Sequence, residues 1–256
     1  MKKKIEPCRF LKWDTDFFGF RIARINKEYL DQDFLNRVFR WCRDNDIECL
    51  YFLADSDDPK TITLAEDNGF HLVEVRITLE RSLKEWPPDS LIQVPPNLII
   101  RPSCKDDIPL LLRIGGGSYL DSRFYLDPCF PQEKCRAYYE TWIKKSCKGR
   151  ADLVLVAEMK GQVVGYITGV VARDKPEGFV ELLSVKPAMR KIGVGQELVK
   201  SLLDWFNRKG VSYVKVVTQG RNIAAQRIFQ RLGFSTYSCQ LYYHKWFFKS
   251  KNKKNT

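Results

Sequence analysis

The sequence predicts an α/β protein, of the α+β kind, built from two halves. Apolar residues recur at helical spacing in some segments and alternate in others, and the two patterns take turns along the chain. A proline-rich stretch at residues 87–96 separates a shorter set of these segments from a longer one. We therefore expect an N-terminal α/β domain over residues 1–94, a second domain over 95–248 and a basic tail over 249–256.

The first half opens with the aromatic side chains Trp13, Phe17, Phe18 and Phe20, followed by alternation through residues 22–25. Helical spacing predicts a helix next, which Asp31 or Asp33 can cap. A second helix is expected to stop at Gly69, because glycine favours helix ends. The expected elements are a helix over 33–43, a strand over 48–53, a helix over 60–68 and a strand over 71–79.

The second half carries a longer pattern. Its first helix should start at Asp106 or Asp107 and end at the glycines of residues 115–117, and Pro131 suits the start of the next helix. Residues 122–128 read as a loop. The remaining expectations are strands over 98–101, 153–158, 163–172, 179–185, 213–217 and 237–247, and helices over 132–147, 195–207 and 222–232.

Composition limits the classes of function. The formal net charge is +12, but eight lysines near the two ends supply most of it, which leaves about +4 for the folded body. That mild bias suits anionic small molecules and gives no reason to expect nucleic acid. No apolar run reaches the roughly 18 residues of a membrane span, and no signal peptide is evident, so we expect a cytoplasmic protein without membrane contact. Eight cysteines without a C-x-x-C pair, with only two histidines, predict reduced thiols and no metal.

The strongest chemical signal is a turn between a strand and a helix, with the pattern Arg190-x-x-Gly193-x-Gly195. Glycines let the backbone approach a ligand closely, and the free N–H groups at a helix start suit a pyrophosphate. Arg190 and Lys191 add positive charge. The turn is no Rossmann fingerprint, because Leu198 stands where a third glycine is needed, and it lacks the G-K-[ST] of a P-loop.

A second pattern, Asn222-x-x-Ala225-x-x-x-Phe229-x-x-x-Gly233-Phe234, follows the next strand. Together the two patterns resemble the GCN5-related N-acetyltransferase (GNAT) superfamily over roughly residues 98–247. The resemblance implies the GNAT fold, in which a mixed sheet flanked by helices splays open beside residues 182–185 and holds acetyl-coenzyme A as the acetyl donor. The cofactor-binding residues that it implies are Leu183, Ser184, Val185, Arg190, Lys191, Ile192, Gly193, Val194, Gly195, Gln196, Asn222, Ala225 and Phe229.

Three further segments, 11–20, 122–134 and 243–246, are similar to the TDP-fucosamine acetyltransferases and their relatives. Those enzymes acetylate the 4-amino group of a nucleotide-linked deoxysugar. This resemblance implies a sugar-nucleotide acceptor, with Arg123, Phe124 and Asp127 as substrate-binding residues, and Arg123 can bind a phosphate bidentately. A homodimer is one assembly open to such an enzyme.

Catalysis needs a proton acceptor for the amine and a proton donor for the departing thiolate. Glu181, acting through water, is the candidate base. Many relatives place a tyrosine donor at the position of Phe229, which has no proton to give, so Tyr243 or its neighbour Tyr242 is the candidate replacement, with Tyr243 preferred. The substitution leaves two alternatives open: a protein or peptide acetyltransferase, and a non-catalytic acyl-coenzyme A sensor.

The first half resembles a degenerate copy of the same fold. Residues 61–70 are similar to the helix that ends at Gly233-Phe234, and a strand follows each. Nothing like the Arg190 pattern precedes residues 61–70, so we expect a structural half without a second cofactor site.

Overall fold

A computed structural model describes residues 6–84, 86 and 95–247 of the chain. They divide into two compact units, and each is described by itself. The first unit combines residues up to Val75 with those from Cys239 onward, and the second unit runs from Arg76 to Ser238. The boundary expected at residue 94 and the tail expected from residue 249 lie outside the described residues, so the predicted domain division stays a prediction.

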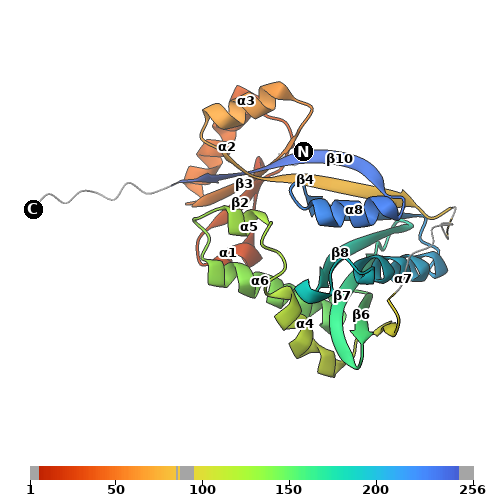
Figure 1. Cartoon of the computed structure of the whole chain (residues 1–256). Helices are drawn as coiled ribbons and strands as arrows, with labels where there is room; N and C mark the ends of the chain where they lie inside the picture. Colours follow the sequence, from red (N-terminus) through yellow and green to blue (C-terminus); the bar gives the residue numbers. More distant parts are fainter. Residues whose placement is uncertain (1–5, 85, 87–94, 248–256) are drawn as a thin grey trace, which may run out of the picture. The chain divides into compact units, whose positions relative to one another are not determined.

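The first unit contains a sheet with helices. Its elements are β1 (Cys8–Phe10), α1 (Lys12–Phe18), β2 (Ile22–Ile25), α2 (Gln32–Asp44), β3 (Cys49–Asp55), α3 (Pro59–Asp67), the start of β4 (His71–Ser82) and most of β10 (Ser235–Trp246). The hydrogen-bonded order is β1-β2-β3-β10, in which β2 and β3 are parallel and β3 and β10 antiparallel. The two helices and two strands predicted for residues 33–79 are confirmed; the unit is drawn mainly in red and orange in Figure 1.

Local chemistry explains where the helices of the first unit begin. The Asp31 carboxylate accepts the Phe34 N–H at 2.7 Å and caps α2, as the sequence predicts. Helix α1 was not predicted, because its run of bulky aromatic residues has only moderate helix propensity. Residues four apart meet on a helix, and the rings of Trp13 and Phe17 stack there with centroids 5.1 Å apart. Gly19, with φ 85°, ends this helix.

The second unit holds the longer pattern. Its elements are the rest of β4, β5 (Leu98–Pro102), η1 (Lys105–Asp107), α4 (Ile108–Gly115), α5 (Arg123–Leu126), α6 (Gln132–Lys145), η2 (Ser146–Arg150), β6 (Leu153–Met159), β7 (Gln162–Val171), β8 (Glu177–Val185), η3 (Pro187–Met189), α7 (Val194–Arg208), β9 (Tyr213–Gln219), α8 (Ile223–Arg231) and the start of β10. The predicted order of helices and strands is confirmed. One addition is the short helix α5, where the sequence predicted a loop.

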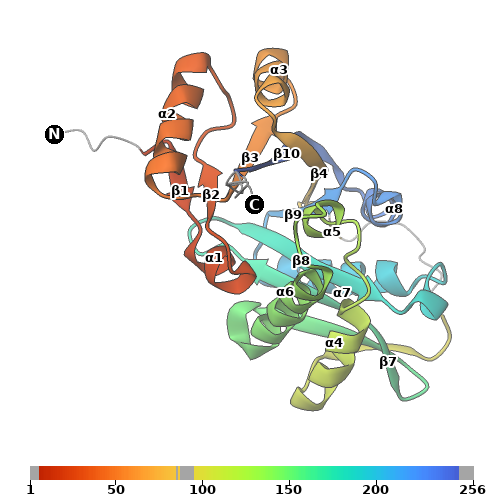
Figure 2. The same ribbon diagram turned by 90° about the vertical axis from the view of Figure 1, so that its left-hand side faces the viewer.

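The sheet of the second unit has the order β4-β9-β8-β7-β6-β5. Only β8 and β9 are parallel, so the sheet is mixed, as expected. Helices α4 and α6 lie on one face of β7 and β8, and α7 lies on the other face (Figure 2). The side of α7 that packs on the sheet carries the buried residues Leu198, Leu202 and Phe206. Strand β8 therefore lies between two layers of helices.

The described residues lack the features that a membrane span or a metal site of three or more ligands requires. No helix within residues 6–84, 86 and 95–247 is both long and apolar enough to cross a membrane. In that part of the chain, no group of three or more His, Cys, Asp or Glu side chains is placed to hold a metal ion. All eight cysteines are free thiols, and burial raises the pKa of the Cys135 thiol to about 11, so it is protonated at neutral pH.

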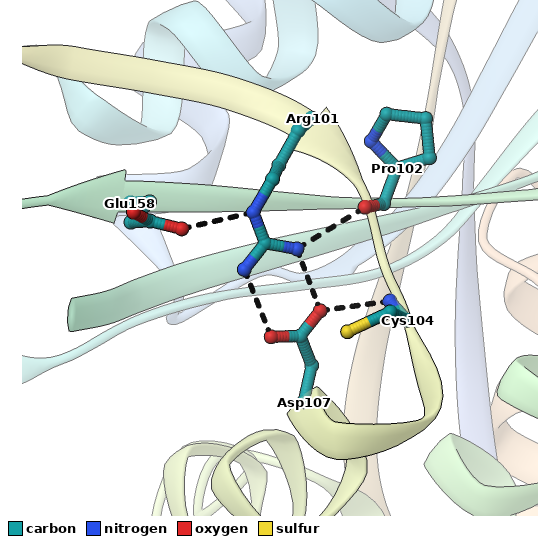
Figure 3. Close-up of polar contacts among 5 residues, drawn as sticks. All are labelled: Arg101, Pro102, Cys104, Asp107 and Glu158. Carbon is teal, nitrogen blue, oxygen red and sulfur yellow. Dashed lines mark hydrogen bonds and ion pairs between the residues drawn. The ribbon is translucent and has the colours of Figure 1, made fainter. Parts of the chain in front are cut away.

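An arginine cluster holds the start of the second unit together (Figure 3). The Arg101 guanidinium donates to both carboxylate oxygens of Asp107, at 2.8 and 3.0 Å, and to Glu158 at 2.9 Å. Asp107 also accepts the Cys104 N–H at 2.8 Å. These bonds connect β5, β6 and the turn that leads into α4. The Arg101 hydrogen bonds lower the pKa of Asp107 to about 2.

This cluster makes the free energy of unfolding depend on pH in the acid range. An unfolded aspartate has a pKa of about 3.9, so a native pKa of about 2 contributes on the order of 2 kcal/mol above pH 5, lost as the pH falls towards 2. We expect the urea-unfolding free energy of the protein to fall by at least that amount between pH 5 and pH 2, because other carboxylates titrate in the same range. In Asp107→Asn this part of the pH dependence should be missing. An equally steep fall in both proteins would contradict the assignment.

Candidate active site

The sheet of the second unit opens between its two parallel strands. β8 pairs with β9 over four residues, as far as Val180 opposite Val216. Beyond that pair no ladder joins the described residues of β8 and β9, although both strands continue. We call this opening the splay; it is formed by residues 181–185 of β8 and 217–219 of β9. The splay that the sequence predicts at this place is confirmed.

A β-bulge marks the start of the splay on β8. Towards β7, Val180 lies opposite Gly169 and Leu182 opposite Thr168, so Glu181 is an extra residue in the ladder. The Leu182 N–H donates to the Thr168 hydroxyl at 3.1 Å. Bulges bend a strand and re-aim its side chains, and they are common beside active sites.

The edge of β8 that faces the splay can bind a ligand through its backbone. The N–H groups of Leu182 and Lys186 donate to β7, the latter to a carbonyl at 2.8 Å. Because backbone groups alternate along a strand, those of Leu183 and Val185 face the splay. Arg190 agrees with this geometry, since its Nε donates to the Val185 carbonyl at 3.0 Å. The Arg190 side chain thus steadies the far end of the splay.

The predicted phosphate turn follows β8 directly. Gly193 precedes α7 in a left-handed conformation with φ 95°, which glycine adopts at little cost, and Lys191 also has a positive φ of 66°. No side chain caps the helix, so the amides of its first turn, on Val194, Gly195 and Gln196, are not satisfied within it. The side chains of residues 190–192 are exposed. Free amides at a helix start with positive charge beside them are the features that suit an anion, and binding of the cofactor there stays a prediction.

Helix α8 borders the same region. The Asn222 side chain accepts the Ala225 N–H at 3.2 Å through its carbonyl oxygen, which leaves its NH₂ group as a donor. A Cβ on Gly195 would lie 3.2 Å from Ile228, so α8 packs beside the start of α7. Ala225 is half-buried, and Phe229 is buried in the apolar core. All thirteen expected cofactor residues thus lie in β8, the turn after it, the start of α7, and α8 with its N-cap, within one unit.

Two hydroxyl pairs lie over β7 and β8, on the face covered by α4 and α6. Ser118 and Ser184 Oγ atoms are 2.6 Å apart, and Tyr119 and Tyr166 Oη atoms 2.9 Å. Ser118 donates its single proton to a carbonyl one turn earlier, so Ser184 donates within the serine pair. The Ser184 side chain is therefore committed to this face, and its backbone points to β7 like that of Leu182 and Lys186, so its cofactor-binding role stays a prediction. Burial raises the pKa of Tyr166, which keeps it protonated.

Sequence reasoning missed Ser118, Tyr119 and Tyr166. Tyr166 lies opposite Ser184 only because of the β7–β8 register, and no local spacing encodes that register. The triple glycine before Ser118 marked the end of a helix but gave no sign of where the next side chains would lie.

Glu181, the candidate base, has two partners on the α6 side. Arg150 Nη1 donates to its Oε2 at 2.6 Å, and Trp142 Nε1 donates to the same oxygen at 3.4 Å. The guanidinium carbon of Arg150 also lies 5.2 Å from the Trp142 ring centroid. These contacts hold the Glu181 side chain in place at the start of the splay. Its role as proton acceptor stays a prediction.

The expected acceptor loop forms α5 and the turn after it. The Arg123 guanidinium lies over the Phe124 ring at 4.0 Å, and Phe124 packs against Phe130 with centroids 5.2 Å apart. Buried Asp127 accepts the Cys129 N–H at 3.0 Å. Phe124 and Asp127 therefore shape the loop, and substrate binding by the three predicted residues stays a prediction.

Tyr243, the candidate proton donor, lies in the core of the first unit. It is fully buried, stacks on Phe52 and donates its hydroxyl to Glu66 at 3.2 Å. Burial raises the pKa of Tyr243 to about 12. Its neighbours Tyr242 and His244 are also buried. Tyr243 and the cofactor residues belong to different units, and the catalytic role of Tyr243 stays a prediction.

Comparison with known proteins gives a consistent picture. Residues 121–234, which contain the splay, the turn and α8, match the family model described as "Acetyltransferase (GNAT) family". The chain is 27% identical over 160 residues to the spore coat polysaccharide biosynthesis protein SpsD of Bacillus subtilis, covering 62% of this chain and 55% of that protein. It is 23% identical over 239 residues to the dTDP-fucosamine acetyltransferase of Escherichia coli, covering 91% of this chain and 94% of that protein.

Among solved structures, the chain is similar to a GCN5-related N-acetyltransferase from Sphaerobacter thermophilus, with a TM-score of 0.67 and 14% identity over 93% of this chain and 76% of that one. At this identity the likeness shows the fold alone. The chain spans little more than half the length of SpsD.

Proposed function

Because residues 121–234 form an acetyltransferase domain of the GNAT family, we propose that this enzyme transfers the acetyl group of acetyl-coenzyme A to the amino group of a nucleotide-linked deoxy-amino sugar. The observation that carries the donor half of the proposal is the splay, which leads on the β8 side into the turn with the uncapped start of α7 and on the β9 side into Asn222. The acceptor half is supported by similarity to dTDP-fucosamine acetyltransferase over 91% of the chain.

The described residues fit the donor. The amides of residues 192–196, with Arg190 and Lys191 beside them, would hold the pyrophosphate. The backbone of Leu183 and Val185 would hold the pantetheine arm and the thioester, because it is the part of β8 that faces the splay. The Asn222 NH₂ group would donate to the arm, and Ala225 and Phe229 would pack along it.

The acceptor amine must lose a proton before it attacks. Glu181 stands at the bulge where the splay begins, so its carboxylate is the base that we assign, acting through a water molecule. The loop of Arg123, Phe124 and Asp127 would bind the sugar nucleotide. Arg123 is suited to a phosphate, because a guanidinium offers paired donors to its oxygens.

After the amine has attacked, the coenzyme A thiolate leaves and takes up a proton. A thiol with a pKa of about 8.5 lies roughly 1.5 units above neutral pH, so leaving unassisted costs about 2 kcal/mol. Phe229 cannot lower this cost, and we assign the donor role to Tyr243.

The donor assignment gives a direct test. Tyr243→Phe should lower kcat on the order of 10²-fold, because a positioned acid is worth that much, and Phe229→Tyr added to it should restore part of the rate. Steady-state kinetics below neutral pH would show the effect best, since a thiolate is least stable there. Tyr29→Phe is the control, because it also removes a tyrosine hydroxyl from the first unit, one bonded to Asp55 at 2.6 Å. Loss of stability without loss of kcat would leave Tyr243 a core residue only.

The acceptor class is tested by thiol release from acetyl-coenzyme A. A panel should contain nucleotide-linked amino-deoxysugars, the matching free sugars and basic peptides. We expect turnover of the sugar nucleotides. Turnover of peptides alone would identify a protein acetyltransferase instead. Binding of acetyl-coenzyme A without turnover of any amine would identify an acyl-coenzyme A sensor.

A further inference from the structure

Arg150 is placed to control the candidate base. It follows α6 across Gly149, whose φ of 99° lets the chain turn back towards the sheet. Arg150 Nη1 donates at 2.6 Å to the Glu181 oxygen that the Trp142 indole also reaches. The Glu181 side chain is 15% exposed, whereas that of Arg150 is 45% exposed. The ion pair therefore has a shielded carboxylate and a guanidinium open to solvent.

The guanidinium has capacity for a second anion. Arginine carries five N–H donors in a planar fork, and the bond to Glu181 uses one of them. The stretch that leads to Arg150 carries three further exposed cations, Lys144, Lys145 and Lys148, so the local potential is positive. A phosphate group would bind such a fork bidentately and more strongly than a single carboxylate oxygen does. Ion pairs with an exposed partner contribute little to stability, so this one can exchange readily.

We propose that Arg150 is the subsite for a phosphate group of the acceptor, and that phosphate binding there draws the guanidinium away from Glu181. The inference rests on the proposed acetyl transfer. Without phosphate, Arg150 and Trp142 both donate to Glu181 Oε2, so this oxygen is occupied and does not reach the water that relays the proton. With phosphate bound, the carboxylate is free to take the proton that leaves the attacking ammonium through water. Through Arg150, the availability of Glu181 as a base depends on whether the acceptor carries a phosphate group. Amines without a phosphate are therefore poorer acceptors.

Kinetics on matched acceptors test the specificity. We expect Arg150→Gln to lower kcat/KM at least tenfold for a nucleoside-diphosphate amino-deoxysugar, mainly through KM. For the same amino sugar without its nucleotide, kcat should rise, because Arg150 no longer occupies Glu181; an unchanged kcat would overturn the release of the base. Arg150→Lys should recover part of the phosphate preference through its charge. Equal change for both acceptors, or no change for either, would overturn the inference.

The control variant loses the same positive charge at a position away from Glu181. Arg136→Gln also removes an exposed arginine of the α6 region from an ion pair, with Glu140 at 2.9 Å, and both acceptors should react with it as with the wild type.

Binding tests the subsite independently of turnover. Inorganic pyrophosphate is titrated into protein saturated with acetyl-coenzyme A, so that the α7 turn is filled, and tryptophan fluorescence is followed. We expect a saturable change that Trp142→Phe removes and that Arg150→Gln weakens at least tenfold. No binding at millimolar pyrophosphate would overturn the inference. Arg150-dependent binding without turnover of any amino sugar would sustain the subsite and refute the proposed acceptor.

Discussion

Gly193→Asp should abolish the binding of acetyl-coenzyme A. We expect the wild type to bind at one site per chain with micromolar affinity in calorimetry, and the variant to show no heat at millimolar ligand. Gly193 is left-handed, with φ 95°, and stands directly before the free amides of α7. A side chain there strains the turn, and a carboxylate repels the pyrophosphate that those amides would bind. Gly195→Asp should act alike, because its Cβ would already approach Ile228 to 3.2 Å.

The matched control is Gly161→Asp. Gly161 is also left-handed, with φ 73°, in the turn between β6 and β7, and a Cβ there meets nothing within 4 Å. Gly161→Asp therefore adds similar backbone strain and the same charge as Gly193→Asp, but away from the start of α7. Micromolar binding by Gly193→Asp, or equal loss in Gly161→Asp, would remove the turn from the donor site.

Glu181→Gln should lower kcat on the order of 10²-fold while leaving the affinity for acetyl-coenzyme A unchanged. Removal of a positioned base typically costs 10²–10⁴ in rate. Glutamine keeps the shape of the side chain, and its carbonyl oxygen can still accept from Arg150 and Trp142, so the bulge should persist. Thiol release under saturating acceptor measures kcat, and calorimetry measures the affinity.

Glu177→Gln controls for the loss of a carboxylate on the same strand. Glu177 pairs with Lys215 at 3.4 Å, four residues before the bulge and outside the splay. Its variant should keep the wild-type kcat. A similar loss in the two variants would mean that charge on β8, and not a base at Glu181, supports the reaction.

The sequence predicted most of the second unit because its signals are local. Alternation and helical spacing mark the elements, and the glycines of the Arg190 pattern mark a turn that only glycine forms easily. Asp31 is a local signal of the same kind, a cap whose partner lies three residues away. Such features depend on neighbours along the chain, so they can be read without a structure.

What could not be predicted depends on residues far apart in the chain. Arg150 and Trp142 meet Glu181 more than thirty residues later, and Tyr119 meets Tyr166 across 47 positions. Neither contact follows from a regular spacing of residues along the sequence, so the sequence gives no sign of it. Helix α1 was missed for another reason, because tertiary packing of its aromatic residues outweighs their modest helix propensity.

The pairing of β10 with β3 has a consequence for synthesis of the protein. Tyr243 lies opposite Phe52, about 190 residues earlier. At the usual 5–20 residues per second, the ribosome needs roughly 10–40 s between making the two partners. The second unit, continuous from Arg76 to Ser238, can assemble during that interval. During this time the edge of β3 that later pairs with β10 has no partner strand. Six of the seven residues of β3 are buried in the finished fold, and an unpaired apolar edge strand is prone to aggregation. The part of the chain made first is thus completed last, and nascent-chain chaperones would find their target in β3.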